Sequence, residues 1–340
     1  MIQRNFRGPR GRIVQWTHAS RVLRRNPLGD PWVRPITVYL PPGYDEERRA
    51  YPLLVDLVGF TGSGLLHVGW QAFTENVPER LDRLIHERRM GKAIAVFPDC
   101  FTSLGGNQYV DSAGLGRYMQ YVADEVVPEV ERRCRVLPGR EHRAVFGKSS
   151  GGYGALLHAM RRPDAWGAAA CHSGDLYFDF CYRMDVPRVL NELAKHGRSP
   201  ARFLRAFRAR PKHNDAEVHT LMFLAMAATY DPDPRQPRRI RLPFDPHTGE
   251  IVEPRWRAWL RHDPIHLTAR DARNLRTLSL LYVDCGDRDQ YHLHYGARIL
   301  HRRLLAHGVR HVYREFPDDH SRVDYRMNAS LPLLWRAVRE

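Results

Sequence analysis

The stretch Gly147-Lys148-Ser149-Ser150-Gly151-Gly152 decides the fold that this chain is expected to adopt. An apolar run over residues 144–146 precedes it, and small and apolar residues follow it with helical spacing up to residue 160. This pattern predicts a strand, a tight turn and a helix. A Gly-x-Ser-x-Gly sequence at such a turn is typical of a nucleophile elbow, where glycines let the backbone turn sharply and expose a serine hydroxyl at the helix N-terminus.

Ser149 is the serine that fits the elbow. It has glycine two positions away on both sides, whereas Ser150 has Lys148 two positions before it. We therefore predict Ser149 as a nucleophile and Ser150 as the following residue, whose backbone N–H would face a developing oxyanion. In a chain with 25 glycines the bare motif can also arise by chance as a structural turn. The strand before it and the helix after it favour the elbow.

Length and composition limit the possible architectures and binding partners. With 340 residues, 43% hydrophobic and 27% charged, the chain can form one large α/β domain with an insertion or two modest domains. The net charge of +15 reflects many arginines, which are scattered without a basic block of five or more. We interpret this as a bias for arginine over lysine and expect no nucleic-acid partner. A substrate carrying a carboxylate or phosphate would also suit this charge.

The spacing of the cysteines and the length of the apolar runs indicate where in the cell this protein is expected. Five cysteines, an odd number at wide spacing, predict reduced thiols and a cytoplasmic location. The first residues are basic but lack the apolar segment of a signal peptide, and the longest apolar run, residues 221–229, is too short to span a bilayer. We expect neither a membrane segment nor a membrane partner.

Strand and helix patterns alternate along most of the chain, which is typical of a largely parallel sheet with helices on both faces. Residues 1–12 are expected to form a loose arm, and residues 13–22 and 35–40 an antiparallel pair at one sheet edge. Further strands are expected at 53–58, 92–97, 144–146, 168–172, 278–284 and 311–316, and helices at 79–89, 118–133, 295–307 and the C-terminus.

The alternation breaks between residues 176 and about 270, where helical segments follow one another without a clear strand. This stretch predicts a mainly helical cap inserted over the site rather than a separate domain. Residues 13–340 are therefore expected to form one domain that carries the cap as an insertion.

A serine nucleophile needs a base, and the base needs a carboxylate to fix its tautomer. On a sheet of this kind the expected chain order is Ser, then Asp or Glu, then His, each in a loop after a strand. Asp289 and His320 satisfy this order, with one helix and one strand between them. We predict His320 as the base and Asp289 as the acid, while Asp287 and Asp284 in the same region stay open as alternatives.

The glycine-rich residues 59–64 follow a strand and allow backbone N–H groups to approach a ligand. Phe60 is the expected second oxyanion donor, the alternative being an ordinary flexible loop. His292 and His294 would share a face only in an extended segment, and further metal ligands near them are not evident, so we predict no metal site.

Several segments together resemble the esterase D / putative esterase family of α/β hydrolases. They are Tyr39-Leu40-Pro41-Pro42-Gly43-Tyr44, the loop at Gly59, Gly147 to Ala155, His172-Ser173-Gly174-Asp175, the turn from Gly286 to Asp289, and Asp319-His320-Ser321. The resemblance runs from about residue 13 to the C-terminus. It implies the α/β-hydrolase fold, serine hydrolysis of carboxylic esters, and Ser149, Asp289 and His320 as the triad.

Two departures from the family pattern limit what the resemblance implies. Val58-Gly59 stands where many members have His-Gly. The segment Pro98-Asp99-Cys100-Phe101-Thr102-Ser103 replaces the Asp-Thr-Ser-Pro-Arg-Gly type expected of S-formylglutathione hydrolases, so glutathione thioester hydrolysis is not assigned.

We therefore expect a serine carboxylesterase that acts on a small-molecule ester and needs no metal or organic cofactor. An acyltransferase with the same triad and a catalytically silent binding protein are the alternatives.

Overall fold

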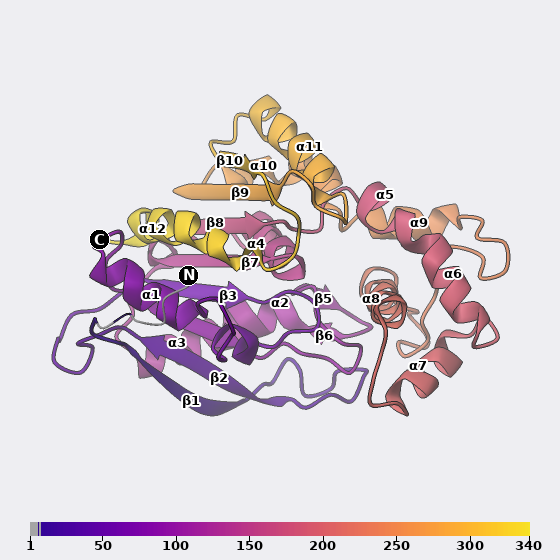
Figure 1. Cartoon of the computed structure of the whole chain (residues 1–340), viewed down its shortest axis with the longest axis horizontal. Coiled ribbons are helices and arrows are strands. Elements are labelled where there is room, and N and C mark those ends of the chain that lie inside the picture. Colours follow the sequence, from indigo (N-terminus) through magenta and orange to yellow (C-terminus); the bar gives the residue numbers. More distant parts are fainter. Residues whose placement is uncertain (1–5, 7) are drawn as a thin grey trace.

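The fold of this protein is built around one eight-stranded sheet, seen in a computed structural model that describes residue 6 and residues 8–340 (Figure 1). The strand order is β1-β2-β4-β3-β7-β8-β9-β10. These strands are β1 (Arg12–Ala19), β2 (Val33–Leu40), β3 (Leu53–Leu57), β4 (Ile94–Pro98), β7 (Arg143–Lys148), β8 (Ala168–His172), β9 (Leu280–Gly286) and β10 (Val312–Phe316). Pairing is antiparallel between β1, β2 and β4 and parallel from β4 to β10, as expected for a largely parallel sheet.

Helices cover both faces of this sheet, because side chains of the buried strands alternate between two apolar clusters. One cluster packs β-strand residues such as Leu54 against α1 (Val77–His86) and α12 (Met327–Val338). The other packs residues such as Val55 on the opposite face against the remaining core helices. Those helices are α2 (Tyr118–Gln120), α3 (Val127–Arg133), α4 (Ser150–Arg161), α10 (Pro264–Leu275) and α11 (Leu293–Ala306).

The predicted antiparallel edge pair is confirmed as β1 and β2, whose register pairs Arg12 with Leu40. The predicted arm over residues 1–12 ends one residue too late, because Arg12 already belongs to β1. Residues 1–5 and 7 of that arm lie outside the described residues.

The helix predicted over residues 118–133 is divided into three segments. A π-helical segment, η2 (Tyr121–Val126), separates α2 from α3. Pro128 lies in the first turn of α3, directly after the π-helical segment. In the π-helical segment, the buried Glu125 carboxylate accepts hydrogen bonds from the backbone N–H groups of Arg21 and Val22.

The stretch predicted as a cap contains five helices, which gather at one end of the molecule (Figure 1). They are α5 (Phe178–Cys181), α6 (Val186–Ala194), α7 (Pro200–Arg208), α8 (Asp215–Tyr230) and α9 (Glu253–Leu260). The expected boundary near residue 270 falls inside α10, which packs against α4 and α11 beside the sheet. Asp263 caps the start of α10, so the helical group ends about seven residues earlier than the pattern indicated.

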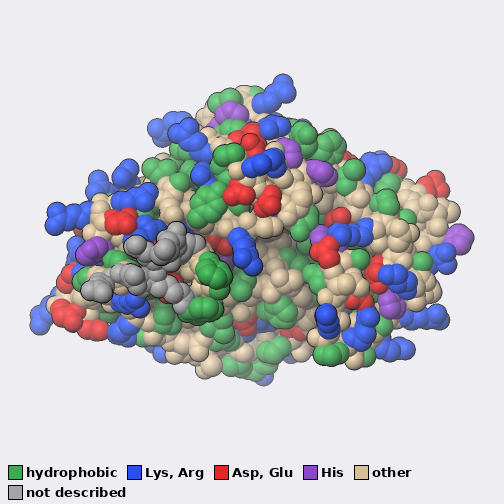
Figure 2. Space-filling model, viewed as in Figure 1, with side chains coloured by type: hydrophobic (Ala, Val, Ile, Leu, Met, Phe, Trp, Pro, Cys, Tyr) green, Lys and Arg blue, Asp and Glu red, His purple; other side chains and the backbone are tan. Residues whose placement is uncertain are grey.

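Short elements complete the fold around the sheet. They are the two-stranded β5 (Asp111–Ser112) and β6 (Gly116–Arg117), and the 3-10 helices η1 (Gly64–His67), η3 (Arg140–His142), η4 (Arg183–Asp185) and η5 (Val323–Arg326). Among the described residues, no helix combines the length and the apolar character needed to cross a membrane. Lys and Arg side chains are spread over the whole visible face (Figure 2), in keeping with the scatter of arginine in the sequence.

His262 is a partly buried histidine that is expected to make the stability of the fold depend on pH. Its ring stacks on Tyr230 with centroids 5.0 Å apart, and its Nδ1 has no hydrogen-bond partner among the residues described. Burial, helped by the charges of Arg161 and Arg261, lowers the pKa of His262 to about 3. The unfolded chain takes up this proton near pH 6.5, so the neutral ring stabilises the fold above that pH and the benefit is lost as the pH falls toward 3.

We expect His262→Phe to keep the stacked ring while removing the basic nitrogens. At pH 8 the variant should match the wild type, and at pH 5 it should be the more stable by about 1–2 kcal/mol. Urea unfolding of both proteins at the two pH values measures this difference. Equal losses of stability between pH 8 and pH 5 would contradict the assignment of His262 as a source of acid sensitivity.

Candidate active site

Ser149 lies at the turn between β7 and α4, in a strained backbone conformation. Its φ of 57° and ψ of −126° are unusual for a residue with a side chain. Glycines make room for this turn, because a Cβ on Gly151 would lie 1.7 Å from the carbonyl oxygen of Leu57, and one on Gly147 would lie 2.3 Å from that same oxygen. The glycines of the motif therefore allow α4 to begin directly against β3, with Ser149 before its first residue.

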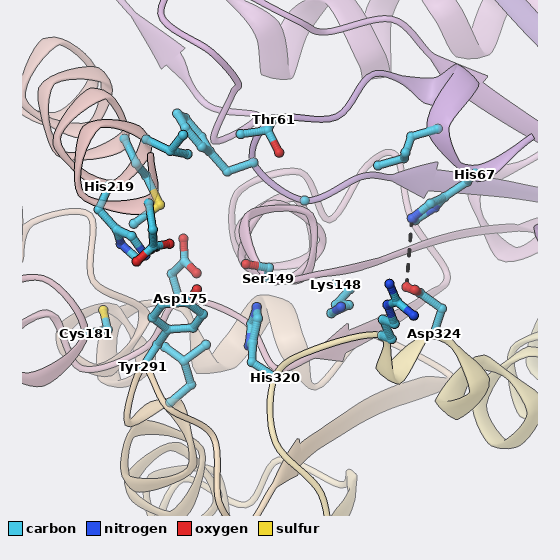
Figure 3. A pocket seen from close by; sticks show the side chains of 18 of the residues that line it. Thr61, His67, Lys148, Ser149, Asp175, Cys181, His219, Tyr291, His320 and Asp324 are labelled. Atoms are coloured by element: carbon cyan, nitrogen blue, oxygen red, sulfur yellow. Dashed lines mark ion pairs between the residues drawn. The ribbon is translucent and has the colours of Figure 1, made fainter. Parts of the chain in front are cut away.

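His320 and Asp289 meet at the same end of the sheet, in the loops after β10 and β9. Nδ1 of His320 and Oδ2 of Asp289 are 2.7 Å apart, and the exposed fractions of the two residues are 8% and 2%. Asp289 is held in turn by the backbone N–H of Tyr291, which donates to its Oδ1 at 2.9 Å. A carboxylate only accepts, so Nδ1 of His320 carries the proton and Nε2 is left with a lone pair. Figure 3 shows the His320 ring directed toward Ser149.

The two other aspartates near Asp289 are placed differently. Asp287 is exposed on its turn, 3.4 Å from the guanidinium of Arg288. Asp284 is buried inside β9, where the Nδ1–H of His172 donates to its Oδ1 at 2.6 Å. Burial alone would raise the pKa of Asp284, but the hydrogen bond from His172 and the charge of Arg326 outweigh it and leave the pKa below its usual range. Of the three, the structure brings Asp289 to His320.

His172 takes part in a second hydrogen-bonded set, which we call the buried relay: Ser330, His172 and Asp284. Nε2 of His172 lies 2.8 Å from Oγ of Ser330 and accepts a hydrogen bond from its hydroxyl, while Nδ1–H donates to Asp284. Ser330 belongs to α12, and all three residues are at most 2% exposed. The relay therefore ties α12 to β8 and β9 and is sealed from solvent.

The glycine-rich loop lies against the elbow. A Cβ on Gly59 would meet Cβ of Ser149 at 3.5 Å, so the two turns are in contact distance. In the part of the chain that the structure describes, the backbone N–H of Phe60 donates to no protein acceptor. Ser150, the first residue of α4, is buried. The loop thus leaves an N–H group next to Ser149; the role of Phe60 and Ser150 as oxyanion donors stays a prediction.

The contacts of Val58 show how the loop is held although many members of the family have histidine at this position. It is buried, and its carbonyl oxygen accepts the Tyr109 hydroxyl at 2.6 Å. Thr61 continues the anchoring, with its N–H donating to the carbonyl of Gly105 at 2.9 Å. The loop is held through its backbone, which does not require a histidine at residue 58.

A cavity of about 640 Å³ opens over Ser149 and extends to both sides of it (Figure 3). On one side its wall comes from the helical group, through residues such as Tyr182, His219 and Met222. On the other side the wall is formed by η1 and the loop that follows it, with Lys148 and Asp324. We call these the cap side and the η1 side. Both His320 and Ser149 line the cavity, so a ligand inside it can reach both.

His67 on the η1 side was missed by the sequence analysis. Its Nδ1–H donates to the buried Asp56 carboxylate at 2.6 Å, and its Nε2 lies 3.9 Å from Asp324 (Figure 3). Burial acts to lower the pKa of His67, but the two carboxylates outweigh it and raise the pKa above its ordinary value. No local pattern marks this residue, because Asp56 lies on β3 and Asp324 belongs to the C-terminal part of the chain. Among the described residues, no cluster of three or more His, Cys, Asp or Glu side chains has the arrangement of a metal site.

Comparison with known proteins shows which family this chain belongs to. The model of the family described as "Putative esterase" matches residues 31–331. Similar solved structures include a ferulic acid esterase, with 20% identity, a TM-score of 0.61, and coverage of 97% of this chain and 99% of that chain. They also include the fluorophosphonate-binding serine hydrolase F of Staphylococcus aureus, with 15% identity, a TM-score of 0.59, and coverage of 98% and 100%.

A third similar structure is an S-formylglutathione hydrolase from Agrobacterium tumefaciens, with 16% identity, a TM-score of 0.59, and coverage of 97% of this chain and 96% of that chain. At such identities these structures establish the shared fold, and the family model establishes the relationship. The expected resemblance and fold are confirmed. Because the family model spans residues 31–331, this protein belongs to the Putative esterase family and is a carboxylic ester hydrolase with the α/β-hydrolase fold.

Proposed function

We propose that this protein hydrolyses small carboxylic esters through a serine nucleophile and an acyl-enzyme intermediate. Oγ of Ser149 attacks the ester carbonyl while Nε2 of His320 takes the hydroxyl proton. The imidazolium then gives this proton to the leaving alcohol, and a water repeats the sequence to release the acid. Asp289 holds the imidazole in the required tautomer and balances its charge. The N–H groups of Phe60 and Ser150 stabilise the oxyanion.

The observation that carries this proposal is the hydrogen bond between His320 and Asp289 beside Ser149 on the wall of an open cavity. The cavity speaks against a catalytically silent protein, because the serine is accessible to a ligand. The same residues would serve an acyltransferase, in which an alcohol replaces water in the second step. The mechanism needs only side chains and backbone N–H groups of this chain. Free cysteines at all five positions support our proposal of a cytoplasmic protein.

The similar structures bear on the substrate class. One is a ferulic acid esterase and another is an S-formylglutathione hydrolase; ferulic acid is an aromatic acid, and S-formylglutathione is a thioester. The cavity over Ser149 combines aromatic and aliphatic walls with a few polar groups, which suits an organic acyl group larger than acetyl. We propose hydrolysis of oxygen esters with a medium-sized acyl group, tested with p-nitrophenyl esters of increasing acyl length.

We expect Asp289→Asn to lower kcat/KM for these esters by roughly a thousandfold or more, because the amide cannot hold His320 in the correct tautomer. Asp287→Asn is the matched control, two residues away on the same turn and exposed, and should keep kcat/KM within about twofold. The comparison is made at the best acyl length of the wild type. A large loss in Asp287→Asn with little change in Asp289→Asn would reverse the assignment of the acid. Hydrolysis too slow to measure by the wild type at every acyl length would argue for a specialised acyl transfer instead.

A further inference from the structure

Asp175 is a carboxylate in the cavity wall that the proposed mechanism does not use. It follows β8 and is only 7% exposed. Three donors converge on one of its oxygens, Oδ2: the hydroxyl of Tyr182 at 2.8 Å, Nε2 of Gln108 at 3.2 Å and the hydroxyl of Ser150 at 3.3 Å. These contacts fix the orientation of the carboxylate relative to the elbow.

The other oxygen of Asp175 is unused. Within the described residues Oδ1 accepts no hydrogen bond, and it is not shut off from the cavity, whose wall Asp175 helps to form. Figure 3 shows the Asp175 side chain on the cap side of Ser149, in the space between Ser149 and His219. An acceptor with a fixed direction therefore faces the ligand space beside the nucleophile.

Burial makes this free oxygen costly to leave unpaired. Desolvation raises the pKa of Asp175, although its three donors and the charge of His320 act against it. In the empty cavity, water can hydrogen-bond to Oδ1. A purely apolar ligand on the cap side would displace that water and leave a buried carboxylate oxygen without a donor. The site should therefore prefer a ligand that brings a donor of its own.

We propose that Asp175 determines specificity by accepting a hydrogen bond from a hydroxyl group on the part of the ester that lies on the cap side. This inference rests on the proposed function and names a substrate class for it: hydroxylated esters, with the hydroxyl a few bonds from the scissile carbonyl. Apolar side chains such as Met222 and Leu293 also line the cap side of the cavity. The substrate group that lies there is therefore expected to be mostly apolar, with one hydrogen-bond donor.

A neutral hydroxyl suits this place better than an ammonium group. His320 becomes an imidazolium during acyl transfer, and its charge already acts on Asp175. A cationic ligand group at Asp175 would repel that imidazolium and oppose the proton transfer. A hydroxyl supplies the donor without the added charge.

The test uses sets of three esters that differ at one position, carrying hydrogen, hydroxyl or methoxy. Ethyl butyrate with its 3-hydroxy and 3-methoxy derivatives varies the acyl part, and propyl acetate with its 2-hydroxy and 2-methoxy derivatives varies the alcohol part. A methoxy group accepts but cannot donate. In at least one set, wild type should hydrolyse the hydroxyl ester with a kcat/KM about ten- to a hundredfold above that of both partners.

Asp175→Asn should weaken or abolish this preference. The three donors hold the amide oxygen, so the NH₂ group turns toward the cavity and offers a donor where the wild type has an acceptor. The ratio of hydroxyl to methoxy ester should fall about tenfold or more. In Asp215→Asn, which alters an exposed carboxylate of the same cavity, the ratio should be retained. A wild type without hydroxyl preference in either set, or an unchanged ratio in Asp175→Asn, would overturn the proposal.

Binding separates this proposal from the proposed function. Calorimetry with wild-type protein and butyrate, 3-hydroxybutyrate and 3-methoxybutyrate, together with propanol and its two derivatives, measures the preference without any hydrolysis. Failure to hydrolyse all six esters would count against the proposed function, whereas tighter binding of a hydroxylated member would still support Asp175 as the acceptor. Equal binding within both sets would reject it, even if Asp175→Asn does not fold.

Discussion

Ser149→Ala is expected to lower kcat/KM for p-nitrophenyl esters by roughly 10⁴-fold or more, because no other group in the cavity replaces the lost nucleophile. The fold should survive this change. Alanine has the same backbone strain as serine at a φ of 57°, and the Ser149 side chain takes part in no helix cap. The free energy of unfolding should therefore stay within about 1 kcal/mol of the wild-type value.

Hydrolysis rates, urea unfolding and labelling with a fluorophosphonate test this expectation together. Ser330→Ala is the matched control, since Ser330 is also hydrogen-bonded to a histidine but is fully buried. It should retain both hydrolysis and labelling, at a cost of about 1–2 kcal/mol in stability for the unpaired nitrogen of His172. Undiminished hydrolysis by Ser149→Ala would remove the basis of the proposed mechanism.

Gly151→Ala is expected to have the largest effect on stability. A methyl group at this position would lie 1.7 Å from the carbonyl oxygen of Leu57 and 2.8 Å from that of Val58. Both atoms belong to backbone at the end of β3, so α4 or the strand must move to relieve the overlap. We expect a loss of about 3 kcal/mol or more, seen as a fall of roughly 4 °C or more in Tm.

Gly59→Ala provides the comparison for stability. Gly59 lies on the neighbouring turn, yet a Cβ there would meet its nearest atoms at 3.5 Å, an ordinary contact distance. Its Tm should remain within about 2 °C of the wild-type value. If Gly151→Ala melted as late as Gly59→Ala, the close contact between α4 and β3 would not be the reason for glycine at this position.

The elbow and the alternation of strands and helices could be predicted because they depend on short-range patterns. The glycines around Ser149 and the apolar run before it indicate a turn without help from distant segments. Accordingly, β7, α4 and β8 lie within a few residues of their expected bounds. The parallel arrangement then follows from the alternation of strands and helices. Because parallel strands end at the same edge of the sheet, the loops carrying Asp289 and His320 were expected to meet, and their side chains do.

What could not be predicted depends on contacts between distant segments. Sequence spacing left three aspartates near β9 as alternatives, since only the folded loop decides which one reaches His320. The start of α10 was included in the cap because nothing in its own sequence shows that it packs against α4. The contacts of Asp175 come from Gln108 and Tyr182, 67 and 7 residues away along the chain, and no pattern brings these together in advance.

The buried relay places the same three residue types in the same order as the predicted triad, with both of its hydrogen bonds formed. A search of coordinates for three catalytic side chains at set spacings would return it as readily as Ser149, His320 and Asp289. Its serine nevertheless lies on the buried face of α12, where neither water nor an acyl group can enter. In this protein, then, position relative to the sheet distinguishes the proposed nucleophile from a serine that can only stabilise the fold. The elbow at the strand ends places Ser149 on the wall of a cavity, whereas Ser330 holds α12 against the sheet.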